Sequence, residues 1–286
     1  MDDRLAGWGS GLIGVLIFSG SLPATRLAVL DFDPMFLTAA RGVIAATLAG
    51  LCLLALKQPL PRRQDLVGLA LSALCVVVGF PLLTALALQQ VSAAHSIVFI
   101  GLLPLSTAIF GVVRGGERPK PAFWLFSCLG AASIAGFALM QGGSGTLAGG
   151  VLMCAAIVVC GFGYAEGARL SRHLGGWQVI SWAVVLAAPL MGVLAIVLRP
   201  EGFGDITLSG WIGLGYVGVF SMLIGFFFWY RGLAKGGIAG VGQLQLLQPF
   251  FGLLLAGLIL QEPVSGAMVL ASVAVVACVA GAKRFA

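Results

Sequence analysis

Ten apolar stretches of about 20 residues follow one another along this chain, separated by short segments that hold charges, prolines or glycine clusters. A helix of that length crosses the hydrocarbon core of a bilayer. Charged residues make up only 9% of the chain, whereas soluble domains have roughly 25%. The pattern predicts an all-α integral membrane protein with ten transmembrane helices, over residues 8–28, 35–56, 66–87, 92–113, 121–140, 148–168, 178–198, 209–230, 238–260 and 264–282.

The second half of the chain repeats features of the first half. Three residues each have an identical counterpart 145 positions later, and one of them is a proline in the middle of an apolar stretch. A fixed offset of this kind is typical of an internal duplication. We therefore expect two five-helix repeats, one over residues 1–142 and one over 143–286. The matched pairs are Pro104 with Pro249, Glu117 with Glu262, and Gly136 with Gly281.

Basic residues are concentrated on one side of the predicted membrane. If the N-terminus is cytoplasmic, thirteen Lys and Arg residues fall in cytoplasmic segments, and only Arg26 and Arg199 fall in outer ones. This bias predicts that the N- and C-termini both face the cytoplasm. Because five helices is an odd number, the second repeat enters the membrane from the opposite side, and we expect inverted repeats. Carriers commonly have this symmetry, which lets one central site face each side in turn.

Residues that would support catalysis or metal binding are scarce in this sequence. The six cysteines lie inside apolar stretches, and the chain has only two histidines. We find no metal-ligand spacing, phosphate-binding loop or nucleophile–base arrangement, and expect no enzyme activity, metal or cofactor. The net charge of +6 follows the loops, so it does not predict nucleic-acid binding. The expected partners are a small-molecule substrate and the lipid bilayer, and a single chain is expected to function as a monomer.

A few polar side chains fall within the predicted spans, where each is costly unless it faces a cavity or a partner. His95 has Phe99 one turn later on the same helix face, which suits a zwitterionic or aromatic solute. Gln245 and Gln248 share a face just before Pro249, and that proline leaves the carbonyl of Gln245 without its helical partner. These groups are candidates for binding a small solute. Hydrogen bonding between neighbouring helices is the alternative in each case.

Prolines interrupt five of the predicted spans. A proline removes one backbone hydrogen bond from a helix and lets it bend, so each is either a hinge for gating or a static kink. Phe80 and Thr84 flank Pro81, and we expect both on an inner face of their helix. The five are Pro23, Pro81, Pro104, Pro189 and Pro249.

Two charged residues within the spans are assigned structural roles. Arg41 either pairs with a solute carboxylate or extends to the outer interface and braces the first helix, and we favour bracing. Glu166 has Arg169 one turn away, and we expect an ion pair. The alternative role for Glu166 is proton coupling, for which His95 is the other candidate.

Aromatic residues gather near one helix end. Trp229 and Tyr230 close the span 209–230, and we expect them in an interfacial aromatic belt. The alternative is a stacking surface for an aromatic solute. Tyr164 and Trp182 are similar cases that lie deeper in their helices.

The chain resembles the drug/metabolite transporter superfamily, of the EamA-like ten-helix type. Arg41 lies where that family commonly has an arginine, and the residues 18–21 lie where many members have an aromatic residue followed by Gly-Ser-Asn. The resemblance implies a central cavity between the first four helices of each half, with the fifth helix of each half as an outer support. Its motifs are Phe18-Ser19-Gly20-Ser21, Pro104…Glu117-Arg118-Pro119 and Pro249…Glu262-Pro263.

Within the superfamily the chain looks most like the YddG group of bacterial exporters of aromatic amino acids and methionine. This implies alternating-access export of small amphipathic metabolites across the bacterial plasma (inner) membrane. The alternatives are a carrier of drugs, nucleotide sugars, sugar phosphates or lipid-linked sugars, and a non-transporting membrane scaffold. Arg41 is the only basic residue well inside a span, which weakens the anionic alternatives. By this resemblance the cavity candidates are Phe80, His95, Phe99, Tyr164, Trp182 and Gln243, and the residue patterns add Thr84 and Gln245.

Overall fold

The computed structural model describes residues 2–115, 120–140, 144–236 and 241–285, and the regular elements in these ranges are all helical. Seven helices are long and apolar enough to cross a membrane, as the sequence predicts for these segments. Three further apolar helices are shorter within the described ranges: Pro121–Gly130, Leu244–Ile259 and Gly266–Cys278. The seven long ones are Leu5–Val29, Pro34–Ala55, Arg63–Gln90, Ala93–Val113, Leu147–Leu174, Gly176–Val197 and Leu208–Lys235.

Several of these spans are built from more than one element. Two elements, η1 and η2, are π-helical, and η3 is a 3₁₀ helix. In chain order the elements are α1 (Asp2–Ser19), α2 (Ser21–Val29), α3 (Pro34–Ala55), α4 (Arg63–Ser72), η1 (Ala73–Gly79), α5 (Phe80–Gln90), α6 (Ala93–Ile100), α7 (Leu103–Gly115), α8 (Pro121–Met140), α9 (Ser144–Leu174), α10 (Gly176–Val197), α11 (Leu208–Gly215), η2 (Tyr216–Ile224), α12 (Gly225–Gly236), η3 (Gly242–Leu247), α14 (Gln248–Ile259) and α15 (Gly266–Arg284).

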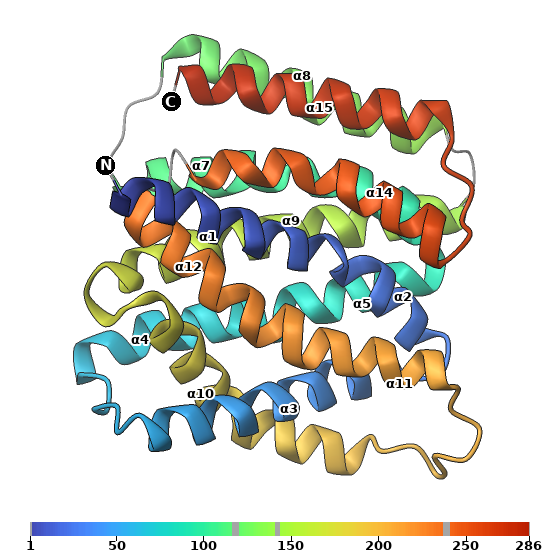
Figure 1. Ribbon diagram of the computed structural model, residues 1–286. Helices are drawn as coiled ribbons and strands as arrows, with labels where there is room; N and C mark the ends of the chain where they lie inside the picture. The colour runs from blue at the N-terminus through green and yellow to red at the C-terminus, as the bar shows by residue number, and fades with distance from the viewer. Residues whose placement is uncertain (1, 116–119, 141–143, 237–240, 286) are drawn as a thin grey trace.

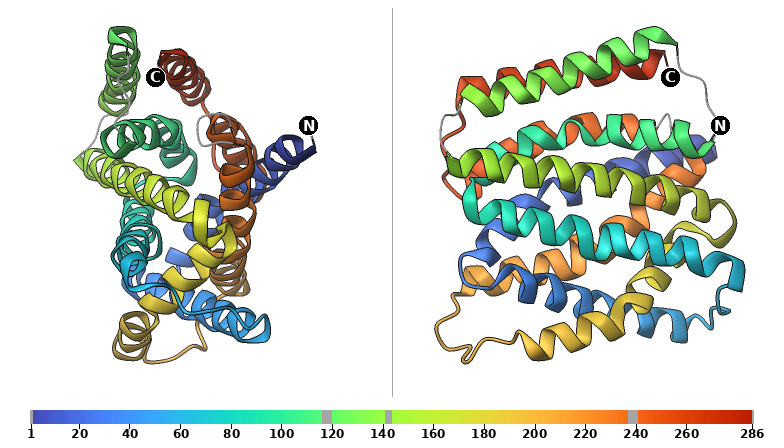
Figure 2. Two further views of the ribbon diagram at one scale, coloured as in Figure 1. Left: turned by 90° about the vertical axis from the view of Figure 1, so that its left-hand side faces the viewer. Right: turned by 180° about the vertical axis from the view of Figure 1, so that it is seen from behind.

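Helices from the two halves of the chain pack against each other through the bundle (Figure 1). α3 packs on α10, α1 on α12, α14 on α6, and α9 on α4, η1 and α5. α8 and α15 pack on each other along one side of the bundle (Figure 2). α1 begins and α15 ends at the same end of the molecule, which we call the terminal end. The opposite end, with the loops after α2, α5 and α14, is the distal end.

Close packing of α1 on α12 depends on glycines. A Cβ on Gly232 would lie 2.8 Å from the Cα of Gly11, and a Cβ on Gly14 would lie 3.1 Å from the backbone nitrogen of Trp229. Real Cβ atoms essentially never come within 3.0 Å of another heavy atom, and 3.1 Å is an unusually tight contact, so larger residues would push the helices apart. Small residues at such crossings are typical of membrane helices, where close van der Waals packing drives association.

The third long span of each half contains a π-helical segment. In the first half the N–H of Phe80 donates to the carbonyl of Cys75, and in the second half the N–H of Gly225 donates to the carbonyl of Phe220. Such segments widen a helix locally and are frequent at functional sites. Both border the central cavity described below.

Four of the five prolines lie beside an interruption. α1 ends at Ser19, shortly before Pro23, and Pro81 follows η1. α6 ends at Ile100 and α7 begins again before Pro104, while η3 gives way to α14 just before Pro249. These changes match the loss of the hydrogen bond that each proline cannot donate.

Pro189 differs from this pattern. α10 is helical from Gly176 to Val197 with Pro189 inside it, so the helix does not end there, and a hinge or kink at Pro189 stays a prediction. The side chain is exposed on the outside of the bundle. α10 also packs on α3, α9 and α12, and that packing holds the helix despite the missing bond.

Candidate functional site

A cavity of ≈ 20 Å³ lies at the centre of the bundle, where spans from both halves of the chain meet. It has room for about one water molecule, whereas pockets for small-molecule ligands measure roughly 300–1,000 Å³. The helices must therefore move apart before a metabolite can occupy this place. The cavity is lined by Phe18, Ser21, Leu22, Arg41, Val76, Phe80, Ile100, Leu103, Tyr164, Ser221, Met222, Phe226 and Gln248.

Arg41 is the charged residue in the wall of this cavity. Its side chain is only 4% exposed, and its Nη2 donates a hydrogen bond to Oγ of Ser221 at 3.3 Å. Oγ of Ser221 lies 2.7 Å from Oγ of Ser21. The bracing role expected from the sequence requires Arg41 to extend to the outer interface. Its side chain is instead buried. It bonds to η2 and reaches the first span only through Ser221.

The charge of Arg41 is not neutralised within the described part of the chain. None of the ion pairs there includes Arg41, and its Nε has no hydrogen-bond partner there. Burying a cation without an opposite charge is costly. A carboxylate that entered the cavity would supply both the charge and the missing acceptor, and guanidinium groups bind carboxylates in two-bond geometry.

One glutamine, Gln248, lines the cavity with Arg41, and a second, Gln245, is buried in the adjoining η3 outside the cavity wall. Nε2 of Gln248 donates to the carbonyl of Phe18 at 3.4 Å, and its Oε1 has no partner among the described residues. Gln245 is 1% exposed, and neither its Oε1 nor its Nε2 has a partner there. Buried amides without partners are expensive in a membrane interior. The amide of Gln248 could form a hydrogen bond with a polar group of a ligand in the cavity.

An aromatic cluster closes the cavity on the side of the terminal end. The ring centroids of Phe18 and Phe226 are 5.0 Å apart, those of Tyr164 and Phe226 5.8 Å, and those of Tyr164 and Trp229 5.9 Å. Tyr230 packs on Phe226 at 5.2 Å. These edge-to-face and tilted contacts are favourable arrangements for aromatic rings.

The positions of Trp229 and Tyr230 contradict the interfacial belt expected from the sequence. They are 1% and 0% exposed, so they lie inside the bundle. Glycines opposite them explain this: Gly14 lies against the backbone of Trp229, and a Cβ on Gly167 would clash with the hydroxyl of Tyr230. The two rings therefore fill space between helices.

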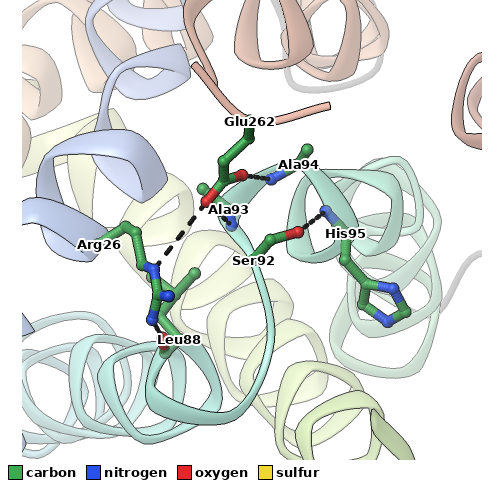
Figure 3. Close-up of polar contacts among 7 residues, drawn as sticks. All are labelled: Arg26, Leu88, Ser92, Ala93, Ala94, His95 and Glu262. Atoms are coloured by element: carbon green, nitrogen blue, oxygen red, sulfur yellow. Dashed lines mark hydrogen bonds and ion pairs between the residues drawn. The ribbon is translucent and has the colours of Figure 1, made fainter. Parts of the chain in front are cut away.

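At the distal end, Glu262 joins the loop after α14 to helices of the first half (Figure 3). Its carboxylate accepts hydrogen bonds from the N–H groups of Ala93 at 3.1 Å and Ala94 at 2.7 Å, in the first turn of α6. Its Oε1 lies 3.9 Å from Nε of Arg26, and Arg26 donates to the carbonyl of Leu88 at the end of α5. A carboxylate is favoured at a helix N-terminus by the uncapped N–H groups. Glu262 thus links the loop after α14 to α6 and α2 at the distal end.

At the terminal end, one ion pair lies within α9, and one side-chain contact joins α9 to α4. The expected pair of Glu166 and Arg169 is present, with Nη2 2.5 Å and Nε 3.2 Å from the two carboxylate oxygens. Nε2 of His173 lies 2.9 Å from Oδ1 of Asp65, which is 4% exposed. A Cβ on Gly68 would lie 2.8 Å from Oε1 of Glu166, so glycine permits this approach of α4.

The structure separates the predicted contact residues into two groups. Phe80 and Tyr164 line the central cavity, while Thr84, His95, Phe99 and Gln245 are buried outside its wall. The ring of His95 packs on Phe99 at 5.5 Å, and it points away from Glu262 (Figure 3).

Two further predicted contact residues lie elsewhere or outside the described side chains. Trp182 lines a separate groove beside Pro189 on the outside of the bundle, so it is not next to the cavity. The side chain of Gln243 lies outside the described residues, as does Glu117.

Sequence reasoning missed Ser221 and Met222 as cavity residues. The repeat offset contains a signal that would have found the serine. Adding 145 to Val76 gives Ser221, and adding 145 to Leu103 gives Gln248, and all four line the cavity. At this offset, polar cavity residues of the second half correspond in sequence to apolar cavity residues of the first half.

Known proteins resemble the chain along its whole length. The model of the EamA-like transporter family matches residues 5–139 and again residues 147–282. Uncharacterized transporter YdeK of Bacillus subtilis (strain 168) is 62% identical over 286 residues, which are 100% of both chains. Uncharacterized transporter sll0355 of Synechocystis sp. (strain ATCC 27184 / PCC 6803 / Kazusa) is 25% identical over 267 residues, 87% of this chain and 81% of that protein.

A solved crystal structure has the same fold. It is 22% identical, superposes with a TM-score of 0.70, and the match covers 98% of this chain and 97% of the other. The apolar helices, the closed central cavity and the two family matches together identify a multi-pass membrane transporter. The chain belongs to the EamA-like transporter family.

Proposed function

We propose that this protein exports small amphipathic carboxylates, with aromatic amino acids and methionine as the substrates it fits best. The observation that carries the proposal is Arg41, a buried cation in the cavity wall without a carboxylate partner in the described chain. In the proposed complex the substrate carboxylate binds Arg41 and Ser221. The side chain of the substrate packs on Phe18, Tyr164 and Phe226.

The character of the cavity wall favours this class over the alternatives. One arginine balances one carboxylate, whereas the phosphate groups of nucleotide sugars and sugar phosphates carry more charge. Gln248 offers an unpaired amide oxygen that can accept from the substrate ammonium group. A drug without a carboxylate would leave the charge of Arg41 unbalanced. A non-transporting scaffold has no need of a buried cation beside a central cavity.

The proposed transport cycle uses two inverted five-helix repeats in a ten-helix bundle, with both termini in the cytoplasm of a bacterium. The paired packing of the halves supports this, since α1 packs on the third span of the second half and α9 packs on the third span of the first. The two family matches support duplication. The aromatic cluster would close the cytoplasmic side, and Glu262 would close the outer side.

Efflux from preloaded proteoliposomes tests this function. Labelled phenylalanine, tryptophan, methionine, lysine and glutamate would be loaded separately, with protein-free vesicles as the blank. We expect the first three to leave faster than the blank and the two charged amino acids to stay. A proton ionophore added in a second series separates proton coupling from passive exit. If none of the five leaves faster than the blank, the substrate class is wrong, and a drug and metabolite panel would follow.

A further inference from the structure

A second and larger groove lies at the terminal end, away from the central cavity. Its volume is ≈ 540 Å³, and it is lined by residues from the end of α3, the end of α9, the start of α10 and the length of α12. Its lining is largely apolar and aromatic, and includes Cys52, Leu56, Trp177, Phe227 and Phe228. Leu56 is 59% exposed, so the groove opens to the outside of the bundle.

The rim of this groove is positively charged. Arg231 and Lys235 lie one turn apart near the end of α12, and both line the groove. No Asp or Glu is among the lining residues in the described chain. Arg231 takes part in none of the ion pairs of the described residues. Its charge is therefore available to a ligand.

The N-terminus of α10 adds to this positive rim. α10 begins at Gly176 after Gly175, whose φ of 93° is left-handed, and no side chain caps the helix. A Cβ on Gly176 would lie 2.6 Å from the backbone nitrogen of Arg231. Glycine therefore brings the first turn of α10 directly beside Arg231. Uncapped N–H groups and the helix dipole favour an anion at such a place.

We propose that this groove binds an anionic phospholipid. The phosphate of the head group would lie between Arg231, Lys235 and the first turn of α10, and one acyl chain would follow Leu56, Cys52 and Phe228. The apolar wall beneath a charged rim matches a lipid, which is apolar below a charged head group. Basic pockets between membrane helices at the cytoplasmic side bind anionic lipid head groups, and the distribution of Lys and Arg assigns this end to the cytoplasm. Trp177 lies in the first turn of α10 and lines the groove, and tryptophans are common at membrane–water interfaces.

The proposal is independent of the central site, and lipid binding tests it directly. The full-length protein in detergent would be titrated with phosphatidylglycerol and with phosphatidylcholine of identical acyl chains, and bound lipid counted by native mass spectrometry. We expect phosphatidylglycerol to bind preferentially. Arg231→Gln should weaken its binding about fivefold, the effect of one basic residue at a membrane surface. Arg199→Gln, an exposed arginine outside the groove, should leave binding unchanged.

A second variant tests the apolar wall. Ala234 is exposed and lines the groove, so Ala234→Trp should fill it and reduce phosphatidylglycerol binding while keeping both cations. Glycerol phosphate, which has the phosphate without acyl chains, should bind far more weakly than the lipid. Equal binding of the two lipids, or an unchanged Arg231→Gln variant, would overturn the proposal. Glycerol phosphate binding as tightly as the lipid would also overturn it, because the site would then hold a soluble anion.

Discussion

The carboxylate of Glu262 accepts the N–H of Ala94 at 2.7 Å, although the two residues are 168 positions apart in the chain. The same carboxylate accepts the N–H of Ala93 and lies near Arg26 (Figure 3). One side chain after α14 thus satisfies the start of α6 and contacts α2. The residue that the repeat singled out in sequence is therefore a cross-link between the halves at the distal end.

Glu262→Gln should destabilise this end of the bundle. The amide keeps one acceptor but loses the negative charge that suits a helix N-terminus, a loss of about 1 kcal/mol. We expect Tm in detergent to fall by about 2–4 °C. Glu201→Gln is the control, because Glu201 is an exposed acidic residue in the loop before α11. An equal Tm for wild type and Glu262→Gln would contradict the role assigned to this carboxylate.

Arg41→Met should separate stability from transport. Methionine is similar in length and apolar, and replacing an unbalanced buried charge by an apolar residue is commonly neutral or stabilising. We expect Tm to stay level or rise, while the efflux rate of phenylalanine falls at least about tenfold, because a charge-assisted bond to the carboxylate is lost. A lower Tm with unchanged efflux would instead mean that Arg41 is structural.

Gly167→Ala should destabilise the packing of α9 on α12. The added methyl group would clash with the hydroxyl of Tyr230, and overpacking of this kind costs about 1–3 kcal/mol. Gly192→Ala is the matched control, since a Cβ there meets no atom within 4 Å. It should leave stability unchanged or raise it by up to about 1 kcal/mol through helix propensity. Thermal unfolding of both variants in one detergent gives the comparison, and equal effects of the two would contradict this packing.

Gln248→Leu should weaken substrate binding without unfolding the protein. Leucine is what the repeat places at the equivalent position, Leu103, so the shape is compatible with the cavity wall. We expect a higher KM for amino-acid transport with little change in Tm. Gln90→Leu, at the exposed end of α5, is the control. An unchanged KM would remove Gln248 from the proposed site.

Features that depend on neighbouring residues along one helix could be predicted from the sequence. Apolar length placed the seven long spans, and the three-residue spacing of Glu166 and Arg169 predicted their ion pair correctly. The sites of most helix interruptions also followed from prolines, because a missing N–H acts locally.

Features that depend on distant helices could not be predicted in this way. Arg41, Ser221 and Ser21 meet because three spans converge, and their separations of 180 and 200 residues carry no local signal. The position of Trp229 at the end of its span predicts an interfacial side chain, yet Trp229 is buried, because Gly14 on α1 allows α12 to pack closely there. Pro189 cannot donate one helical hydrogen bond, yet α10 continues past it while packing on α3, α9 and α12.

The most direct test of the central claim compares phenylalanine with phenethylamine, which has the same ring and amino group but no carboxylate. Efflux of each would be measured from proteoliposomes that contain wild type or Arg41→Met. We predict that wild type exports phenylalanine and leaves phenethylamine at the blank rate, and that the variant loses the phenylalanine signal. If wild type exports both compounds equally, or if the variant exports phenylalanine as fast as wild type, Arg41 does not bind the substrate carboxylate.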